Sequence, residues 1–263
     1  MFKREMKINL KGFLIWTTIL VGMFFLILVI YPNVIAGESA EMMDEMLKMF
    51  PEDLLKAFNM DISSINTAFG WLKSEGFVMI LLIIGCYAGV LGSNILLKEE
   101  SDKTIEYLNS LPVSRTKIVI SKVFAGLIYI VLMVVLLGIF NFIGLSITEE
   151  FDEKLLLLLS ITPLLPAVVI YFLCMFLSTF THKTKKTLGI SLGIVMLSYV
   201  LQVLSTMGEK LEFLKYTSAF TLADIRNVMT EACINPVMIV VTVTISLILF
   251  IVTLFRYDRK ELV

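Results

Sequence analysis

Residues 98–122 read KEESDKTIEYLNSLPVSRTKIVISK, and this polar, charge-dense stretch lies between two long apolar segments. The first segment is FVMILLIIGCYAGVLGSNILL over 77–97, and the second is VFAGLIYIVLMVVLLGIFNFIGL over 123–145. Each is long enough to cross the roughly 30 Å hydrocarbon core of a bilayer, which takes about 20 apolar residues as a helix. The sequence therefore predicts a chain that leaves the membrane after residue 97, forms a short polar hairpin and returns.

The rest of the chain repeats this alternation of apolar spans and polar connections. The protein has 263 residues, of which 58% are hydrophobic, and its mean hydropathy of +0.90 lies far outside the range of soluble domains. We predict an all-α polytopic membrane protein made of a single transmembrane domain, residues 1–263. Pro163 and Pro166 are expected to kink the fourth span. The six predicted spans, none of which contains Asp, Glu, Lys, Arg or His, are 13–31, 77–97, 123–145, 155–180, 188–207 and 236–255.

The distribution of positive charge predicts the orientation of these spans. Fifteen of the 22 Lys and Arg residues lie in the two termini and in the connections 98–122 and 181–187. Because loops rich in Lys and Arg stay in the cytoplasm, we place both termini there, in a plasma membrane. Lys122 is expected at the membrane interface, with its ammonium group extended toward water.

The remaining connections also carry structural signals. Residues 1–12 mix basic and apolar side chains, which predicts an amphipathic helix in the cytoplasmic interface or, alternatively, a plain basic tail. Residues 32–76 form the largest outer connection, and residues 208–235 are too apolar for a solvated loop. We expect short helices over 208–235 that dip back toward the membrane as a re-entrant segment.

The outer connection 32–76 contains an amphipathic helical pattern. Its apolar face packs on the spans or lies on lipid in one interpretation; in the other, it is an acidic, methionine-lined surface for a cationic amphipathic substrate. The candidate substrate surface consists of Glu41, Met42, Asp44, Glu45, Met46 and Met49.

Within the spans, two kinds of residue are candidates for function. Gly85 with Gly89 and Gly189 with Gly193 form GxxxG pairs, which allow close helix packing inside one subunit or at a seam between subunits. Neutral polar residues could line a substrate path or hydrogen-bond between helices; these are Asn94, Tyr129, Asn141, Tyr171, Tyr199 and Gln202.

The sequence offers little for catalysis or for an energy source of its own. It contains no HExxH or CxxC motif, so we expect no catalytic residue and no bound metal. It also has no GxxxxGK[ST] phosphate-binding loop, and the predicted spans contain no ionisable residue of the kind that ion-coupled carriers use. The energy for any transport is therefore expected to come from a partner.

The hairpin 98–122 is the predicted point of energy input. Ile105, Leu108 and either Leu111 or Pro112 fall on one side of a short helix, with Asp102 and Glu106 on another. Such an apolar ridge could insert into a cleft of a soluble domain, and burying three such side chains contributes about 4–8 kcal/mol before the cost of association. The alternative is a helix that rests on lipid.

The stretch EESDKTIEYLNSLPVSRTKIVISK (99–122) resembles the corresponding stretch of ABC-2-type permeases, the membrane subunits of bacterial ABC exporters. The resemblance implies a type V exporter-like transmembrane domain with a coupling helix over 102–111. It also implies two permease subunits, identical or sister chains, and two separate ATPase subunits that bind ATP and Mg²⁺. The coupling positions are Glu99, Glu100, Asp102, Thr104, Ile105, Glu106, Leu108, Leu111, Pro112 and Arg115.

The long 32–76 connection is similar to that of permeases that export, or give immunity to, peptide antibiotics and bacteriocins in Gram-positive bacteria. We therefore expect a permease subunit of an ATP-driven exporter of an amphipathic or peptide-like substrate, without ATPase activity or a cofactor of its own. The alternative is a membrane sensor or scaffold that binds a ligand through its outer loop and signals through its cytoplasmic loop. Neither reading involves nucleic acid.

Overall fold

The computed structural model describes residues 2–35, 67–105, 113–148, 150–207, 209–223 and 225–260. The described residues are 87% helical and contain no strand. Six helical segments are long and apolar enough to cross a membrane, which confirms the predicted number of spans. These segments are Phe2–Tyr31, Ala68–Ile95, Arg115–Thr148, Glu153–Ser178, Thr184–Thr206 and Pro236–Asp258.

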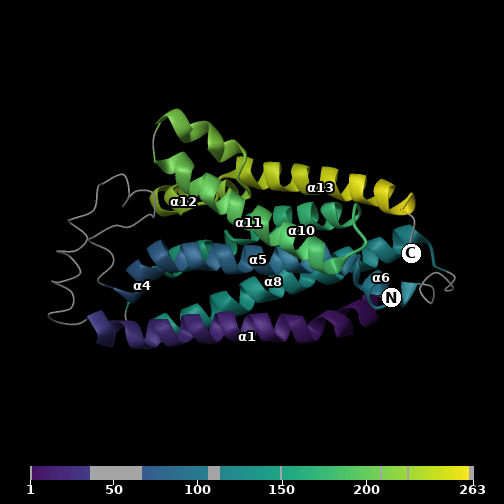
Figure 1. The fold of residues 1–263 in the computed structure, drawn as a ribbon. Coiled ribbons are helices and arrows are strands. Elements are labelled where there is room, and N and C mark those ends of the chain that lie inside the picture. The colour runs from purple at the N-terminus through teal and green to yellow at the C-terminus, as the bar shows by residue number, and fades with distance from the viewer. Residues whose placement is uncertain are drawn as a thin grey trace.

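The long helices run side by side along one axis, with both ends of the chain at the same end of the bundle (Figure 1). Helix α5 lies at the centre and packs against α10, α11 and α8, while α1 packs along α8 and α13 packs along α10. The long helices are α1 (Phe2–Ile35), α5 (Phe77–Ile95), α8 (Arg115–Thr148), α10 (Leu164–Ser178), α11 (Thr184–Thr206) and α13 (Pro236–Asp258).

Several helices begin or end where the sequence gives a physical reason. The fourth span is broken at Thr162 and Pro163 into α9 (Glu153–Ile161) and α10, as the two prolines predict. Helix α13 has proline in its first turn, and the Asn235 side chain caps its start by accepting a hydrogen bond from the Val237 amide.

The N-terminal segment does not form a separate element. Helix α1 continues without a break from Phe2 to Ile35, so the predicted interfacial helix over 1–12 is the first part of a 34-residue helix. The Tyr129 hydroxyl of α8 donates to the Met6 carbonyl, and Glu5 is buried. Contacts with α8 therefore hold this segment in line with the span.

Short helices follow α11, in the region where a re-entrant segment was predicted. They are η2 (Glu209–Tyr216), η3 (Ala219–Leu222) and α12 (Ile225–Glu231). Phe220 of η3 is fully buried, and a Cβ atom built on Gly85 would lie 2.8 Å from its ring. The segment therefore packs back into the bundle against α5, α10 and α11.

At the same end, helix α4 (Ala68–Trp71) leads through a π-helical turn, η1 (Leu72–Gly76), directly into α5. The described helix of the second span is therefore longer than the apolar run 77–97, and it includes the charged residues Lys73 and Glu75.

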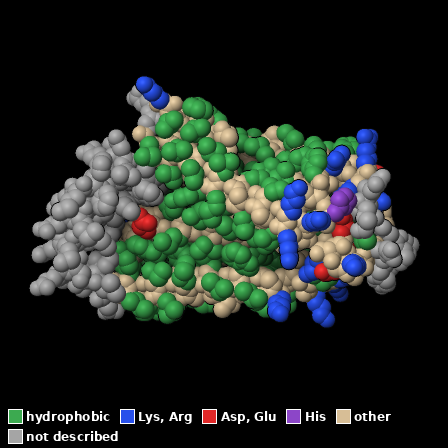
Figure 2. Space-filling model, viewed as in Figure 1, with side chains coloured by type: hydrophobic (Ala, Val, Ile, Leu, Met, Phe, Trp, Pro, Cys, Tyr) green, Lys and Arg blue, Asp and Glu red, His purple; other side chains and the backbone are tan. Residues whose placement is uncertain are grey.

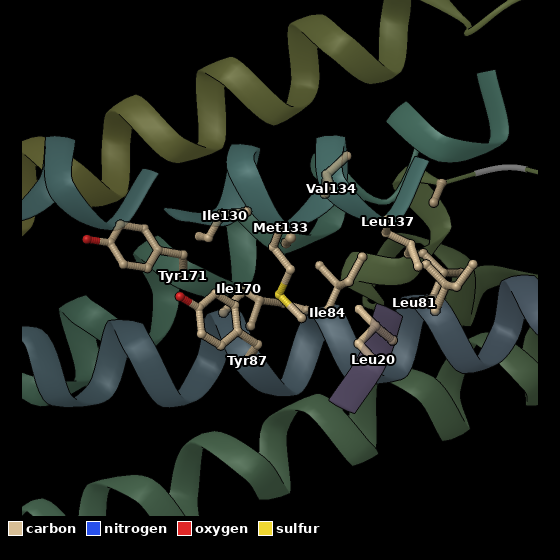
Figure 3. Packing of buried hydrophobic residues seen from close by; sticks show 14 of the residues in the cluster. Leu20, Leu81, Ile84, Tyr87, Ile130, Met133, Val134, Leu137, Ile170 and Tyr171 are labelled. Atoms are coloured by element: carbon tan, nitrogen blue, oxygen red, sulfur yellow. The ribbon is translucent and has the colours of Figure 1, made fainter. Parts of the chain in front are cut away.

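The core is formed where α1, α5, α8 and α10 meet. Met133 and Ile170 are fully buried at its centre, between the tyrosine side chains and the leucine side chains (Figure 3). Residues shown there are Leu20, Leu81, Ile84, Tyr87, Ile130, Met133, Val134, Leu137, Ile170 and Tyr171. Large apolar side chains also cover the outside of α1, α8, α11 and α13, as expected for surfaces that face lipid (Figure 2).

Small residues set the closest helix crossing. A Cβ atom on Gly92 of α5 would overlap the carbonyl oxygen of Tyr171 in α10, so the two backbones touch at this point. Gly89 is also buried, and a Cβ atom there would lie 3.2 Å from Val195. Gly85 and Gly89 therefore pack inside one chain. By contrast, added Cβ atoms on Gly189 and Gly193 would meet nothing within 4 Å.

Replacing Gly92 by alanine should destabilise the bundle by about 1–3 kcal/mol, because the α5 and α10 backbones would have to separate. The thermal unfolding midpoint of the purified chain in detergent measures this effect. Gly22→Ala is the matched control, since its Cβ meets nothing within 4 Å and alanine is the better helix former. Equal midpoints for the two variants would contradict the close crossing.

Candidate functional site: a buried ion-pair node at the basic end

Both ends of the described chain and the described parts of the predicted coupling loop lie at one end of the bundle, which we call the basic end (residues 2–12, 97–105, 113–122, 181–186 and 256–260). Figure 2 shows most of the Lys and Arg side chains of this face gathered at that end, around His182. Beneath this charged surface, ionisable side chains are buried inside the protein, where charges persist only when they are paired.

Lys122, near the start of α8, is the centre of the first cluster. Its Nζ donates to both carboxylate oxygens of Glu99, at 2.7 and 2.8 Å, and to the carbonyl oxygen of Ile95 at 2.7 Å. Its Nζ also lies 3.3 Å from Glu5 Oε2. Because Lys122 is only 1% exposed, the prediction that its ammonium extends to water is wrong. The two carboxylates and the Ile95 carbonyl hold it inside.

Glu100, the next residue after Glu99, is the centre of the second cluster. Its Oε1 accepts from Lys260 Nζ at 2.7 Å, and its Oε2 lies 2.9 Å from His182 Nδ1. Lys260 Nζ also donates to the Thr181 carbonyl at 2.8 Å. This cluster joins the turn between α10 and α11 to the C-terminal end of α13.

The adjacent carboxylates of Glu99 and Glu100 belong to a single helical turn, α6 (Lys98–Ser101). Glu99 connects it to α1, α5 and α8, and Glu100 connects it to the α10–α11 turn and the C-terminus. We call Glu5, Glu99, Glu100, Lys122 and Lys260 the node. Parts of the chain that are far apart in sequence are thus held to one turn at the root of the predicted coupling loop.

The node has more negative than positive charge. Three carboxylates face two lysines, and Glu5 Oε1 is buried with no hydrogen-bond partner among the described residues. Buried ion pairs carry a large desolvation penalty, and removal of one partner leaves an uncompensated charge that costs about 3–5 kcal/mol. The node is therefore sensitive to the loss of either lysine.

Helix α6 ends in a tight turn. Lys103 has a positive φ of 54°, its amide donates to the Glu100 carbonyl, and the Thr104 amide donates to the Glu99 carbonyl. These are the hydrogen bonds of a Schellman motif. Asp102, Lys103 and Thr104 thus form a turn, so the predicted helix over 102–111 does not begin at Asp102.

The structure places the other predicted coupling residues as follows. Ile105, just after the turn, is buried, whereas Asp102 and Thr104 are exposed. Arg115 Nη1 donates to the carbonyl oxygens of Asp258 and Lys260, at 2.8 and 3.0 Å, so the return of the loop is tied to the end of α13. Glu106, Leu108, Leu111 and Pro112 lie outside the described residues, as do the outer-loop residues Glu41, Met42, Asp44, Glu45, Met46 and Met49.

The six neutral polar candidates lie in different places. The Tyr129 and Tyr171 hydroxyls hydrogen-bond to backbone carbonyls, of Met6 and Lys122 respectively, and so connect helices. Asn94 and Asn141 each have a buried side-chain oxygen without a partner among the described residues. Tyr199 and Gln202 line a small cavity of about 30 Å³ beside Phe77.

The described residues contain no group of three or more His, Cys, Asp or Glu side chains arranged to hold a metal ion. Gly189–Gly193 reads GISLG and so matches the nucleophile motif GxSxG. However, Ser191 lies within helix α11 rather than on a strand-to-helix turn, and the chain's single histidine pairs with Glu100 instead. Ser191 and His182 are therefore not arranged as a nucleophile and its base.

Residues 5–262 match the model of the ABC-2 family transporter protein, and the chain belongs to this family. The protein is thus an integral membrane component of ABC transporters, in the position of a permease. No curated protein and no solved structure matches the chain.

The sequence places Glu99 and Glu100 in the predicted coupling loop and Lys122 at the membrane interface, but it does not indicate that these side chains pair inside the protein. One signal was available in the sequence. Lys122 directly adjoins an uninterrupted apolar run, a place where an inward-facing lysine needs a carboxylate partner.

Replacing Lys122 by methionine should destabilise the chain by about 3–5 kcal/mol, because Glu5 and Glu99 would remain buried without a cation. The triple variant Glu5→Gln/Glu99→Gln/Lys122→Met removes all charge from this cluster and should recover more than half of the loss. Thermal unfolding in detergent measures both, with exposed Lys117→Met as the control. A single variant as stable as the control would rule out the first cluster.

Proposed function

We propose that the protein is the permease subunit of an ATP-driven exporter, with its basic end in the cytoplasm. Three observations support this proposal: membership of the ABC-2 transporter family, the excess of Lys and Arg at the end that carries both termini, and the polar hairpin between the second and third spans. The mechanism rests on the node, because it links the base of the hairpin to the ends of several membrane helices.

The energy comes from a separate ATPase subunit that binds the 98–122 hairpin. The sequence has no phosphate-binding loop of its own, so ATP and Mg²⁺ belong to that partner. Closure of two ATPase subunits around ATP pushes the hairpin. Buried ion pairs join α6 to Lys122 of α8, which also pairs with Glu5 of α1, and to Lys260 at the end of α13, which in turn donates to the Thr181 carbonyl in the α10–α11 turn. The push therefore moves the ends of these helices together rather than bending the loop alone.

The complex contains two permease subunits, of the same or a sister chain. Side chains of the same chain occupy the space beside Gly85 and Gly89, so this glycine pair does not form the contact between subunits. Gly189 and Gly193 of α11 remain open on the surface beside exposed Ile190 and Leu197. This face of α11 is the better candidate for contact with the second subunit.

The substrate is an amphipathic or peptide-like molecule, and the outer loop 32–76 takes part in its capture. The charge pattern of the loop supports this part of the proposal, because its methionine-rich segment carries several carboxylates that would attract a cationic peptide. In this arrangement the protein exports or clears peptides from the membrane of a Gram-positive bacterium.

The docking proposal is tested with Leu108→Asp, which places a charge on the apolar side of the hairpin. We expect an ABC ATPase subunit from the same genome to co-purify with the unmodified chain and to be lost with this variant. Ser114→Asp is the control, since Ser114 is exposed in the same hairpin. If the Leu108→Asp variant still co-purified with the ATPase, docking through this side of the hairpin would be contradicted. If no ATPase co-purified with the unmodified chain, a sensor or scaffold would be favoured.

The outer-loop proposal is tested separately with Glu41→Gln/Asp44→Asn/Glu45→Gln. We expect this variant to reduce resistance to a cationic amphipathic peptide while the basal ATPase activity of the complex stays unchanged, because the substituted residues lie far from the hairpin in sequence. Unchanged resistance would mean that this acidic segment does not capture the substrate.

A further inference from the structure

A cavity at the basic end is lined by none of the node residues. It has a volume of about 330 Å³ and is lined mainly by α1 and α5, with α6 and the start of α11 at its edge. Gly12 and Trp16 form its wall on α1, and Tyr87 and Asn94 form its wall on α5. Its volume is within the range of small-molecule sites.

Three buried polar atoms on the wall of this cavity have no hydrogen-bond partner among the described residues. They are the hydroxyl of Tyr87, the side-chain oxygen of Asn94 and the hydroxyl of Thr184. Tyr87 is only 3% exposed. Buried polar groups are nearly always hydrogen-bonded in folded proteins, so three unpaired atoms around one cavity favour a polar ligand that supplies the missing bonds.

The polarity of the cavity changes along α5. Lys98 and Asp102, of opposite charge, line it at the α6 end, and neither has an ion-pair partner in the described part of the chain. At the other end, the rings of Trp16 and Tyr87 lie 6.0 Å apart. Residues 87 and 98 are separated by about 16 Å of helix, so the cavity suits a molecule with a charged head and a less polar body.

We propose that this cavity binds a zwitterionic glycerophospholipid from the leaflet at the basic end. Lys98 pairs with the phosphate and Asp102 with the ammonium group of the head. Asn94 accepts a hydrogen bond from the head, and the Tyr87 hydroxyl donates to an ester carbonyl of the glycerol backbone. An anionic lipid would leave Asp102 without a partner and bring its own negative charge close to it.

The surface next to the cavity suits the acyl chains. Ile15 and Ile19 lie three and seven residues after Gly12, on the same face of α1, and both are more than half exposed. A lipid with its head in the cavity can therefore lay its chains along α1. This continuity with the membrane favours a lipid over a soluble peptide, and the inference holds whether or not the protein proves to be an exporter.

The test uses Trp16 as a reporter. The chain has two tryptophans, so Trp71→Phe leaves Trp16, which lines the cavity, as the single fluorophore. The purified full chain in detergent is titrated with phosphatidylethanolamine that carries a nitroxide near the start of one acyl chain, which leaves the ammonium group free to donate to Asn94. We expect saturable quenching of Trp16, relieved by unlabelled phosphatidylethanolamine and at least about tenfold less well by phosphatidylglycerol, since loss of one charged partner is worth about 1.5–3 kcal/mol.

Two glycines of α1 provide matched variants in the Trp71→Phe background. Added Cβ atoms on Gly12 and Gly22 both meet nothing within 4 Å, but only Gly12 lines the cavity. Gly12→Leu should therefore fill the cavity and abolish saturable quenching, while Gly22→Leu should leave it unchanged. Tyr87→Phe keeps the ring but removes the hydroxyl, and should weaken binding about fivefold.

Four outcomes would overturn the proposal: quenching that does not saturate, equal quenching in the Gly12→Leu and Gly22→Leu variants, equal competition by phosphatidylglycerol, or displacement by a cationic amphipathic peptide at lower concentration than by phosphatidylethanolamine. If Gly12→Leu fails to fold, the Tyr87→Phe comparison still decides, because this variant changes no packing volume. Unchanged affinity in Tyr87→Phe would show that the hydroxyl does not contact the lipid.

Discussion

The burial of the Lys122 ammonium is the constraint on which the basic end of this structure depends. A lysine that is 1% exposed cannot be solvated by water, so its charge has to be balanced by side chains that come to it. Glu99, Glu5 and the Ile95 carbonyl fill that role, and they come from α6, α1 and α5. One buried charge thus fixes how the helices meet where the predicted coupling loop begins.

The arrangement explains how a short loop could move a large membrane domain. Dispersion and small-residue packing hold the spans together in the apolar region, where Gly92 touches the α10 backbone. At the basic end, directional ion pairs and hydrogen bonds to backbone carbonyls replace this packing. Since Glu99 and Glu100 are adjacent on one turn, α6 cannot shift without displacing partners on both sides of the bundle. These contacts hold α6 and the helix ends around it together.

Much of the fold follows from the sequence, because six long apolar runs separated by charged connections are compatible with little other than six membrane-spanning helices. The break of the fourth span at Pro163 was also predictable, since proline cannot continue the hydrogen-bond ladder. The position of Lys122 indicates that it needs a carboxylate partner, but the partners themselves were not predictable, because the side chains that meet at Lys122 and Glu100 are separated by up to 160 residues. The sequence also could not show that Phe220 packs against Gly85 and Val195 against Gly89, whereas no side chain of the same chain packs against Gly189.

The central claim is that the node carries the movement of the ATPase into the membrane helices. The most direct measurement compares ATP hydrolysis and substrate transport in liposomes that contain the permease with its ATPase. The complex carries either the unmodified chain or the Glu5→Gln/Glu99→Gln/Lys122→Met variant. We expect the variant to keep its ATPase subunit and to hydrolyse ATP, but to transport far less substrate per ATP. Transport per ATP equal to that of the unmodified complex would contradict it.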